Sequence, residues 1–265
     1  MPSRSPATAA HALFERLSNA AKQDDMPSEL ELARIRLDAR KLMAVDAKDA
    51  HQLLGGIAAV EVDEDKVRYH HEAAIKLTSA VDAVRNYSIS LQLIGQFEDA
   101  AKYAALAAEA QPENLSLLRS AIDFASYAGQ PRKALELIQV LRKRAPDHTD
   151  AREGIIQDLL LVMDRTGLTE SELQTSLKLA FQLLRDRRLR FGHIHDSILL
   201  EDGAECVHYR IYLAADAKVV RELDSQLGRL LADQLEEMHS ASLLVDYGSL
   251  EVHKSVDEPQ TDRVL

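Results

Sequence analysis

Apolar residues recur at helical spacing through the first 190 positions of the chain. The spacing predicts a helix over residues 7–22 and a second over residues 28–45. The second helix starts at Ser28 and Glu31, which form a capping box in which each side chain accepts from a free backbone amide of the other residue. Thr169 and Glu172 repeat this arrangement. They predict a helix over residues 169–190 that follows another helix over residues 150–164.

A 34-residue spacing appears between residues 48 and 148. It relates Gly95 to Gly129, Ala100 to Ala134, Ala107 to Leu141 and Pro112 to Pro146. Each residue type has a structural reason: glycine permits a positive φ where a helix ends, alanine lets two helices approach closely, and proline ends a helix. A weaker copy with a period of 33 lies upstream and includes Leu54 and Gly55.

This pattern resembles the tetratricopeptide repeat family, whose unit is a 34-residue helix–turn–helix. The resemblance places units at residues 48–80, 81–114 and 115–148, with a degenerate helix pair at 149–190. The 48–80 unit lacks both the turn glycine and the closing proline. The implied fold class is mainly α, with a helical superhelix (α-solenoid) over residues 29–190 that follows a tail and short helix in residues 1–28.

The periodicity changes to two after Phe191, which indicates strands over residues 193–200 and 204–213 around a turn at Asp202 and Gly203. This register gives one apolar face, made of Ile194, Ile198, Leu200, Val207, Tyr209, Ile211 and Leu213. A helix over residues 214–239 and a strand over 242–252 follow. We therefore expect a small α+β (ββαβ) domain at residues 191–252 and a polar tail at 253–265.

Composition excludes several classes of protein. The chain has 265 residues, 43 acidic against 32 basic, a net charge of −11, and Cys206 as its one cysteine. One cysteine excludes a disulfide framework, and the acidic balance disfavours nucleic acid as a partner. Residues 191–265 hold 15 acidic and six basic residues, so most of the negative charge lies there. No apolar run is long enough to span a membrane, and we expect a soluble, cytoplasmic protein.

Candidate chemistry is sparse. His193, His195 and His208 would lie near one another on the hairpin, and imidazole groups at short range are what a zinc or manganese site requires. A metal-dependent activity there is one alternative. The favoured interpretation is a polar secondary surface made of His195, Ser197, His208, Arg210 and Tyr212. The chain shows no phosphate-binding loop or nucleophile elbow. We expect no catalytic residues, no cofactor and no bound metal.

Basic residues cluster at the end of the helix over residues 169–190, at Arg185, Arg187, Arg188 and Arg190. Cations at a helix C-terminus oppose the negative end of its dipole, which is a sufficient structural reason for them. The alternative is a regulator that contacts nucleic acid or a nucleic-acid enzyme through these arginines.

The resemblance also implies a concave groove lined by the first helix of each unit. Its candidate positions here are Asp49, Gln52, Arg85, Asn86, Ile89, Gln92, Arg119, Asp123, Ser126 and Tyr127. Arg85, Asn86 and Arg119 are similar to part of the family's clamp for a C-terminal carboxylate, but Gly56 and Ser120 depart from it. The leading hypothesis is a non-enzymatic adaptor that binds a peptide or protein in the groove. A free edge of the ββαβ sheet would then serve a second contact or self-association.

Overall fold

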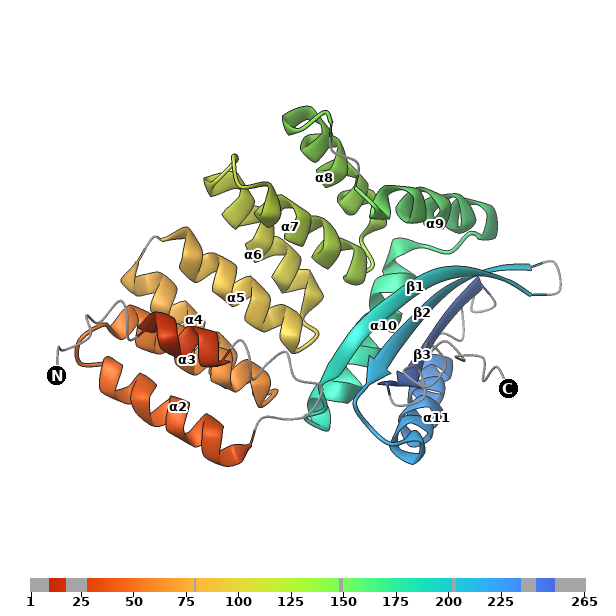
Figure 1. The fold of residues 1–265 in the computed structure, drawn as a ribbon. Coiled ribbons are helices and arrows are strands. Elements are labelled where there is room, and N and C mark those ends of the chain that lie inside the picture. The colour runs from red at the N-terminus through yellow and green to blue at the C-terminus, as the bar shows by residue number, and fades with distance from the viewer. Residues whose placement is uncertain are drawn as a thin grey trace, which may run out of the picture.

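The protein is mainly α-helical and consists of an array of paired helices followed by a small three-stranded sheet (Figure 1). The computed structural model describes residues 10–17, 28–78, 80–147, 150–201, 204–234 and 242–250. Residues 10–17 are helical. The array continues with α2 (Glu29–Leu42), α3 (Ala47–Val60), α4 (Glu64–Leu77), α5 (Val81–Leu93), α6 (Phe97–Ala110), α7 (Leu115–Tyr127), α8 (Pro131–Arg144), α9 (Arg152–Thr166) and α10 (Glu170–Asp186). The fold class is therefore a tetratricopeptide-like superhelix followed by an α+β unit.

The turn inside each helix pair contains a residue with positive φ just after the first helix. Gly95 and Gly129 both have φ of 72°, and Gly167 has φ of 78°. Val62 takes the corresponding place after α3 with φ of 54°, although a side chain disfavours this conformation. The absent turn glycine of the first unit therefore leaves the turn geometry unchanged, and the valine side chain is buried in the core.

The helix caps predicted at Ser28 and Thr169 are present in the structure. The Ser28 hydroxyl accepts from the amide of Glu31 at 3.2 Å, and α2 ends at Leu42 rather than at residue 45. At α10 both halves of the capping box form, since the side chains of Thr169 and Glu172 each accept from the other residue's amide. This helix ends at Asp186, four residues before the expected end. Of the helix expected over residues 7–22, only residues 10–17 lie in the described part.

The sheet has the order β1-β2-β3. Strand β1 (Phe191–Glu201) pairs antiparallel with β2 (Ala204–Leu213) in the expected register, with Glu201 opposite Ala204. The turn residues themselves lie outside the described part of the chain. Helix α11 (Ala217–Gln234) crosses over to β3 (Leu243–Ser249), which pairs parallel with β2. The expected ends of this helix and strand, after residues 234 and 250, fall outside the described residues.

One buried cluster joins the sheet to the last helix pair of the array. Its largest members include Met163 of α9, Phe181 of α10, Tyr209 of β2 and Tyr247 of β3. The Tyr247 hydroxyl donates to the backbone oxygen of Ala180 in α10 at 2.6 Å. The apolar face predicted for the hairpin is therefore the face that packs on α9 and α10. Among the helices that the structure describes, none combines the length and apolar character needed to cross a lipid bilayer.

Candidate functional site

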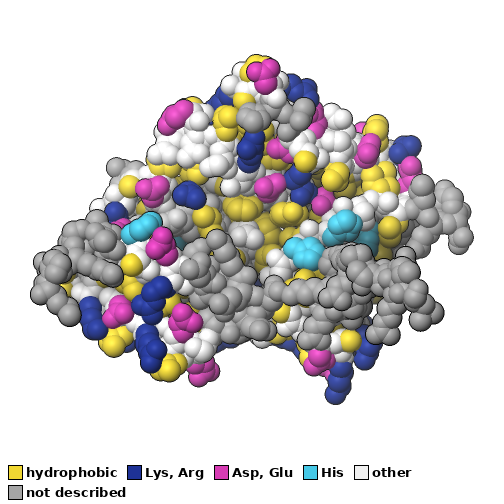
Figure 2. Space-filling view, in the orientation of Figure 1, with side chains coloured by type: hydrophobic (Ala, Val, Ile, Leu, Met, Phe, Trp, Pro, Cys, Tyr) yellow, Lys and Arg dark blue, Asp and Glu magenta, His cyan; other side chains and the backbone are white. Residues whose placement is uncertain are grey.

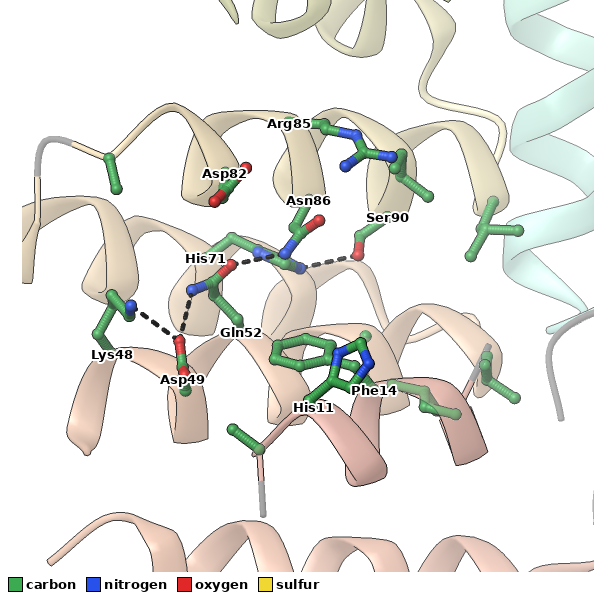
Figure 3. Close-up of a pocket in the computed structure, with 17 residues that line it drawn as sticks. His11, Phe14, Lys48, Asp49, Gln52, His71, Asp82, Arg85, Asn86 and Ser90 are labelled. Carbon is green, nitrogen blue, oxygen red and sulfur yellow. Dashed lines mark hydrogen bonds and ion pairs between the residues drawn. The ribbon is translucent and has the colours of Figure 1, made fainter. Parts of the chain in front are cut away.

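A pocket lies between residues 10–17, α3 and α5. It has a volume of about 690 Å³. Asp49, Gln52, Arg85, Asn86 and Ile89 of the expected groove all line it. Figure 3 shows His11 and Phe14 of the short helix on one side of this space and residues of α5 on the other. Half of the expected groove residues thus meet in one cavity.

A chain of polar contacts connects α3 to α5 along the wall of the pocket. The Lys48 ammonium lies 3.0 Å from an oxygen of Asp49, which accepts from the Gln52 amide at 3.2 Å. The Gln52 oxygen in turn accepts from the Asn86 amide at 2.7 Å (Figure 3). The hydrogen bond to Asp49 raises the pKa of Lys48, so the ammonium stays charged. These contacts fix the orientation of the Gln52 and Asn86 amide groups in the pocket wall.

His71 of α4 closes the bottom of this pocket. Its Nε2 lies 2.8 Å from the Ser90 hydroxyl, and its ring stacks on Tyr87 with centroids 5.2 Å apart. Gly55 makes room for the ring, because a Cβ at that position would lie 2.5 Å from an atom of His71. Burial lowers the pKa of His71 to about 3, so the ring is neutral at physiological pH. His71 is therefore a packing residue between helices.

Arg85 and Ile89 are the exposed groups of the α5 wall. Ile89 is 36% exposed although it is a large apolar residue, and Arg85 is exposed one turn before it. Within the described residues Arg85 takes part in no ion pair. Gln92 is half-buried further along α5, and Arg119 is exposed on α7. An apolar and a cationic group therefore face the groove together.

The other expected groove residues gather around Arg152 of α9. Its guanidinium donates to the Tyr127 hydroxyl and to the Ser126 hydroxyl, both at 2.9 Å, and to Asp196 of β1 at 2.6 Å. Asp123 lies 3.9 Å from the same group. Ser126 is only 1% exposed, so its hydroxyl serves this internal contact rather than an open groove surface. Burial lowers the pKa of Arg152, but the nearby Asp196 and Asp123 carboxylates and the Tyr127 hydroxyl together outweigh burial and raise the pKa of the guanidinium.

Figure 2 shows apolar side chains in a hollow in the middle of this face, between the array and the sheet. Aromatic rings from both parts of the molecule meet behind the groove. Phe97 lies 5.5 Å from Tyr127 and 5.8 Å from Phe191 of β1, measured between ring centroids. These rings belong to the packed cluster that joins the array to the sheet.

Comparisons with known proteins add little to this picture. No family model matches the chain, and no curated protein matches it either. Among solved structures, one from a functional characterization of Pseudomonas aeruginosa PilF is similar over 87% of this chain and 88% of that chain, with 13% identity and a TM-score of 0.41.

The hairpin residues expected on the secondary surface differ in their exposure to solvent. On the expected secondary surface, His195 is exposed, while Ser197, Arg210 and Tyr212 are partly exposed. The prediction that His208 lies on this surface is wrong, because His208 is 6% exposed and its Nε2 lies 3.1 Å from Asp246 of β3. Arg210 binds the same carboxylate. The third strand covers His208 because it pairs along β2.

The three histidines of the metal alternative do not converge. His193 stacks on Tyr212 with centroids 4.3 Å apart, His195 lies opposite Arg210, and His208 lies opposite Ser197. Within the part of the chain that the structure describes, no group of three His, Cys, Asp or Glu side chains is arranged to hold a metal ion.

Two arginines of the basic cluster at the end of α10 bind other parts of the protein. Arg185 is 8% exposed, and its guanidinium donates to the backbone oxygens of Ile94 and Gly95 at 3.4 and 3.3 Å. Arg187 donates to Gln226 of α11 at 2.7 Å. The nucleic-acid alternative therefore loses Arg185, because this side chain closes the end of α5 and does not face solvent.

Two features of the site were missed from the sequence. Arg152 carried no pattern that marked it, since its partners come from 25 to 44 positions away. The apolar spacing of residues 10–17 predicted a helix, but nothing in it placed that helix on the concave side of α3.

Proposed function

We propose that the protein is a non-enzymatic scaffold that binds a peptide or protein segment in the concave groove lined by α3 and α5. The observation that carries the proposal is the preformed pocket itself. Its wall holds Gln52 and Asn86 in a fixed hydrogen-bonded chain, while Arg85 and Ile89 stand exposed beside it. A pocket wall with an oriented Asn86 amide, the cations Lys48 and Arg85 and the exposed apolar side chain of Ile89 is suited to a peptide, which offers backbone groups and side chains together.

The chemistry of the groove supports binding over catalysis. Ser90 and His71 make a contact that resembles a nucleophile and its base, at 2.8 Å. Both are nearly inaccessible, at 4% and 1% exposure. The His71 Nδ1 has no hydrogen-bond partner among the described residues, so no carboxylate orients the ring. A base with a pKa of about 3 would also remove a hydroxyl proton poorly at neutral pH.

The test is affinity capture with the full chain, followed by mass spectrometry. The groove variant is Arg85→Glu/Arg119→Glu. The matched control is Arg34→Glu/Arg229→Glu, which makes the same change in charge at two exposed arginines on α2 and α11. We expect the groove variant to lose proteins that both the wild type and the control retain. Identical sets of captured proteins from all three chains, at equal stability, would refute the groove assignment.

A second contact surface is proposed at the outer edge of β1. The opposite edge of the sheet is engaged, because the Tyr247 amide of β3 donates to Asp224 of α11 at 2.8 Å. In the described part of the chain, β1 pairs with β2 alone. An open edge strand offers unpaired amides and carbonyls, so a second copy of the chain can add its own β1 there.

Sedimentation equilibrium over a range of protein concentrations tests this contact. We expect a mass that rises towards the dimer, and a smaller rise for His195→Lys/Ser197→Lys, because paired cations repel across the new edge. A monomer mass at every concentration would refute self-association through β1 and leave the groove proposal untouched.

A further inference from the structure

Residues 10–17 form a short amphipathic helix whose apolar side faces the array. Ala10, Leu13 and Leu17 are 2%, 8% and 7% exposed, and Phe14 packs against the same cluster. Their spacing of three, four and seven positions gives one continuous stripe along a helix. His11 and Glu15 lie on the opposite side, exposed and 3.4 Å apart. The segment therefore has the form of a helix that binds a groove through one face.

Its seat is a position that the resemblance assigns to the ligand groove. Gly56 of α3 stands where the family's groove has a polar side chain, and here Leu17 lies against it. A Cβ at Gly56 would approach the Leu17 Cδ2 to 2.7 Å, which is closer than real side chains allow. The missing side chain at Gly56 is thus what lets a leucine from a second helix rest on the groove floor.

The polar attachment of this segment to the array is slight. Arg16 lies 3.7 Å from Asp38 of α2, and both side chains are about two-fifths exposed, so solvent weakens the ion pair. Among the described residues, no hydrogen bond joins residues 10–17 to α3 or α5. Apolar contacts therefore hold the segment in place.

The groove continues beside the segment. Phe14 and Leu17 form one wall of the pocket of about 690 Å³, and Ile89 and Leu93 of α5 form the facing wall. Apolar side chains on both walls, with space between them, match the requirement of a helix that inserts its apolar stripe.

We infer that the groove takes an amphipathic helix of a partner protein, and that residues 10–17 occupy its first-unit end as an intramolecular stand-in which the partner helix displaces. This rests on the proposed function and names the chemistry of its ligand: apolar residues at positions i, i+3, i+4 and i+7. The alternative is that residues 10–17 are a permanent cap of the superhelix.

The first experiment tests the seat. Gly56→Ala adds the Cβ that meets Leu17, while Gly228→Ala makes the same change in α11, where no atom lies within 4 Å. Hydrogen exchange with mass spectrometry reports on residues 10–17. We expect Gly56→Ala to lower protection there while α3 and α5 stay protected, and Gly228→Ala to match the wild type. Unchanged protection in Gly56→Ala would overturn the assignment of the seat.

The second experiment tests displacement, using a fluorescent peptide that copies residues 7–20. Leu13→Asp/Leu17→Asp in the full chain empties the seat and leaves the residues of α3 and α5 that line it unchanged. We expect the peptide to bind this variant at least tenfold more tightly than the wild type. Adding Gly56→Ala to the same chain should abolish the gain. A peptide that itself carries both aspartates should not bind.

Two results would overturn the inference. One is that the peptide binds the wild type and the double variant equally or not at all. The other is that the double variant loses the cooperative unfolding of the array, because residues 10–17 would then be a structural cap. Either failure is separate from that of the proposed function, since capture through Arg85 and Arg119 is measured on a chain whose residues 10–17 are unaltered.

Discussion

The turn glycine at position 95 offers the sharpest test of how the array is held together. In Gly95→Ala, the new Cβ would lie 2.6, 2.8 and 2.9 Å from three atoms of the Phe181 side chain. Phe181 is 2% exposed and packs between Phe97 and Phe191, with centroids 4.9 and 5.3 Å away. The ring has little room to move, so the added methyl group must displace packed neighbours.

The magnitude follows from two separate costs. A residue with a side chain in the left-handed conformation costs about 1–2 kcal/mol. Overpacking a buried site typically costs about 1–3 kcal/mol more. We therefore expect Gly95→Ala to lower the free energy of unfolding by about 2–5 kcal/mol. Gly129→Ala shares the positive φ, but its new Cβ would stay at least 3.1 Å from its neighbours. We expect a loss of about 1–3 kcal/mol there.

Urea denaturation followed by circular dichroism measures all of these variants. Gly228→Ala is the matched control: it makes the same chemical change in the middle of α11, in open space, and should gain about 0.5–1 kcal/mol. The expected order of stability is Gly228→Ala, wild type, Gly129→Ala and Gly95→Ala. A Gly95→Ala chain as stable as the wild type would refute the argued contact with α10.

Three further predictions concern charge and burial. His71 is neutral in the fold, because its pKa is about 3 there against about 6.5 in the unfolded chain, so its contribution to stability is complete above pH 6.5 and declines as the pH falls towards 3. Urea titrations should therefore show that His71→Phe loses less stability than the wild type between pH 6.5 and pH 4.5. Parallel stability profiles of the two chains would contradict this. Arg152→Met should lower the free energy of unfolding by about 3 kcal/mol, because it leaves the buried Asp196 carboxylate unpaired. The double variant Arg152→Met/Asp196→Leu should recover part of that loss. Additive losses in stability would disprove the ion pair between Arg152 and Asp196. Burial raises the pKa of Asp246, but hydrogen bonds from Arg210 and His208 outweigh burial and leave the pKa below its usual range. The contribution of Asp246 to the free energy of unfolding is therefore present above about pH 4 and lost below, so Asp246→Asn should flatten the fall in stability at acid pH. An unaltered fall in stability at acid pH would contradict this prediction.

The sequence determined local geometry better than long-range contacts. The phase of the repeat, the capping box at Thr169 and the register of the hairpin were predictable, because each depends on residues within a few positions or on a strict period. The left-handed turn at Val62 was not predictable, since packing of a buried valine overrides the local preference.

Long-range partners account for the features that were missed. Asp196 alternates with Ile194 and Ile198 and therefore lies on the face of β1 turned to the array, where Arg152 binds it. Alternation along a strand does not say which polar residue will find a cation on another helix. For the same reason Ser126 and Tyr127, expected in the groove, lie instead at the junction with β1.

The ion pair between Arg185 and Glu64 has a consequence for how the chain folds. Its atoms are 3.2 Å apart although the residues are 121 positions apart, and the same arginine binds the carbonyls at the end of α5. An open repeat array unfolds by fraying from its ends, since each unit contacts only its neighbours. Here Arg185 of α10 contacts the first and second units, so detachment of the last helices breaks these contacts and exposes the turn after α5. The array should therefore unfold as one cooperative block, and its folding should wait for a contact of high sequence separation.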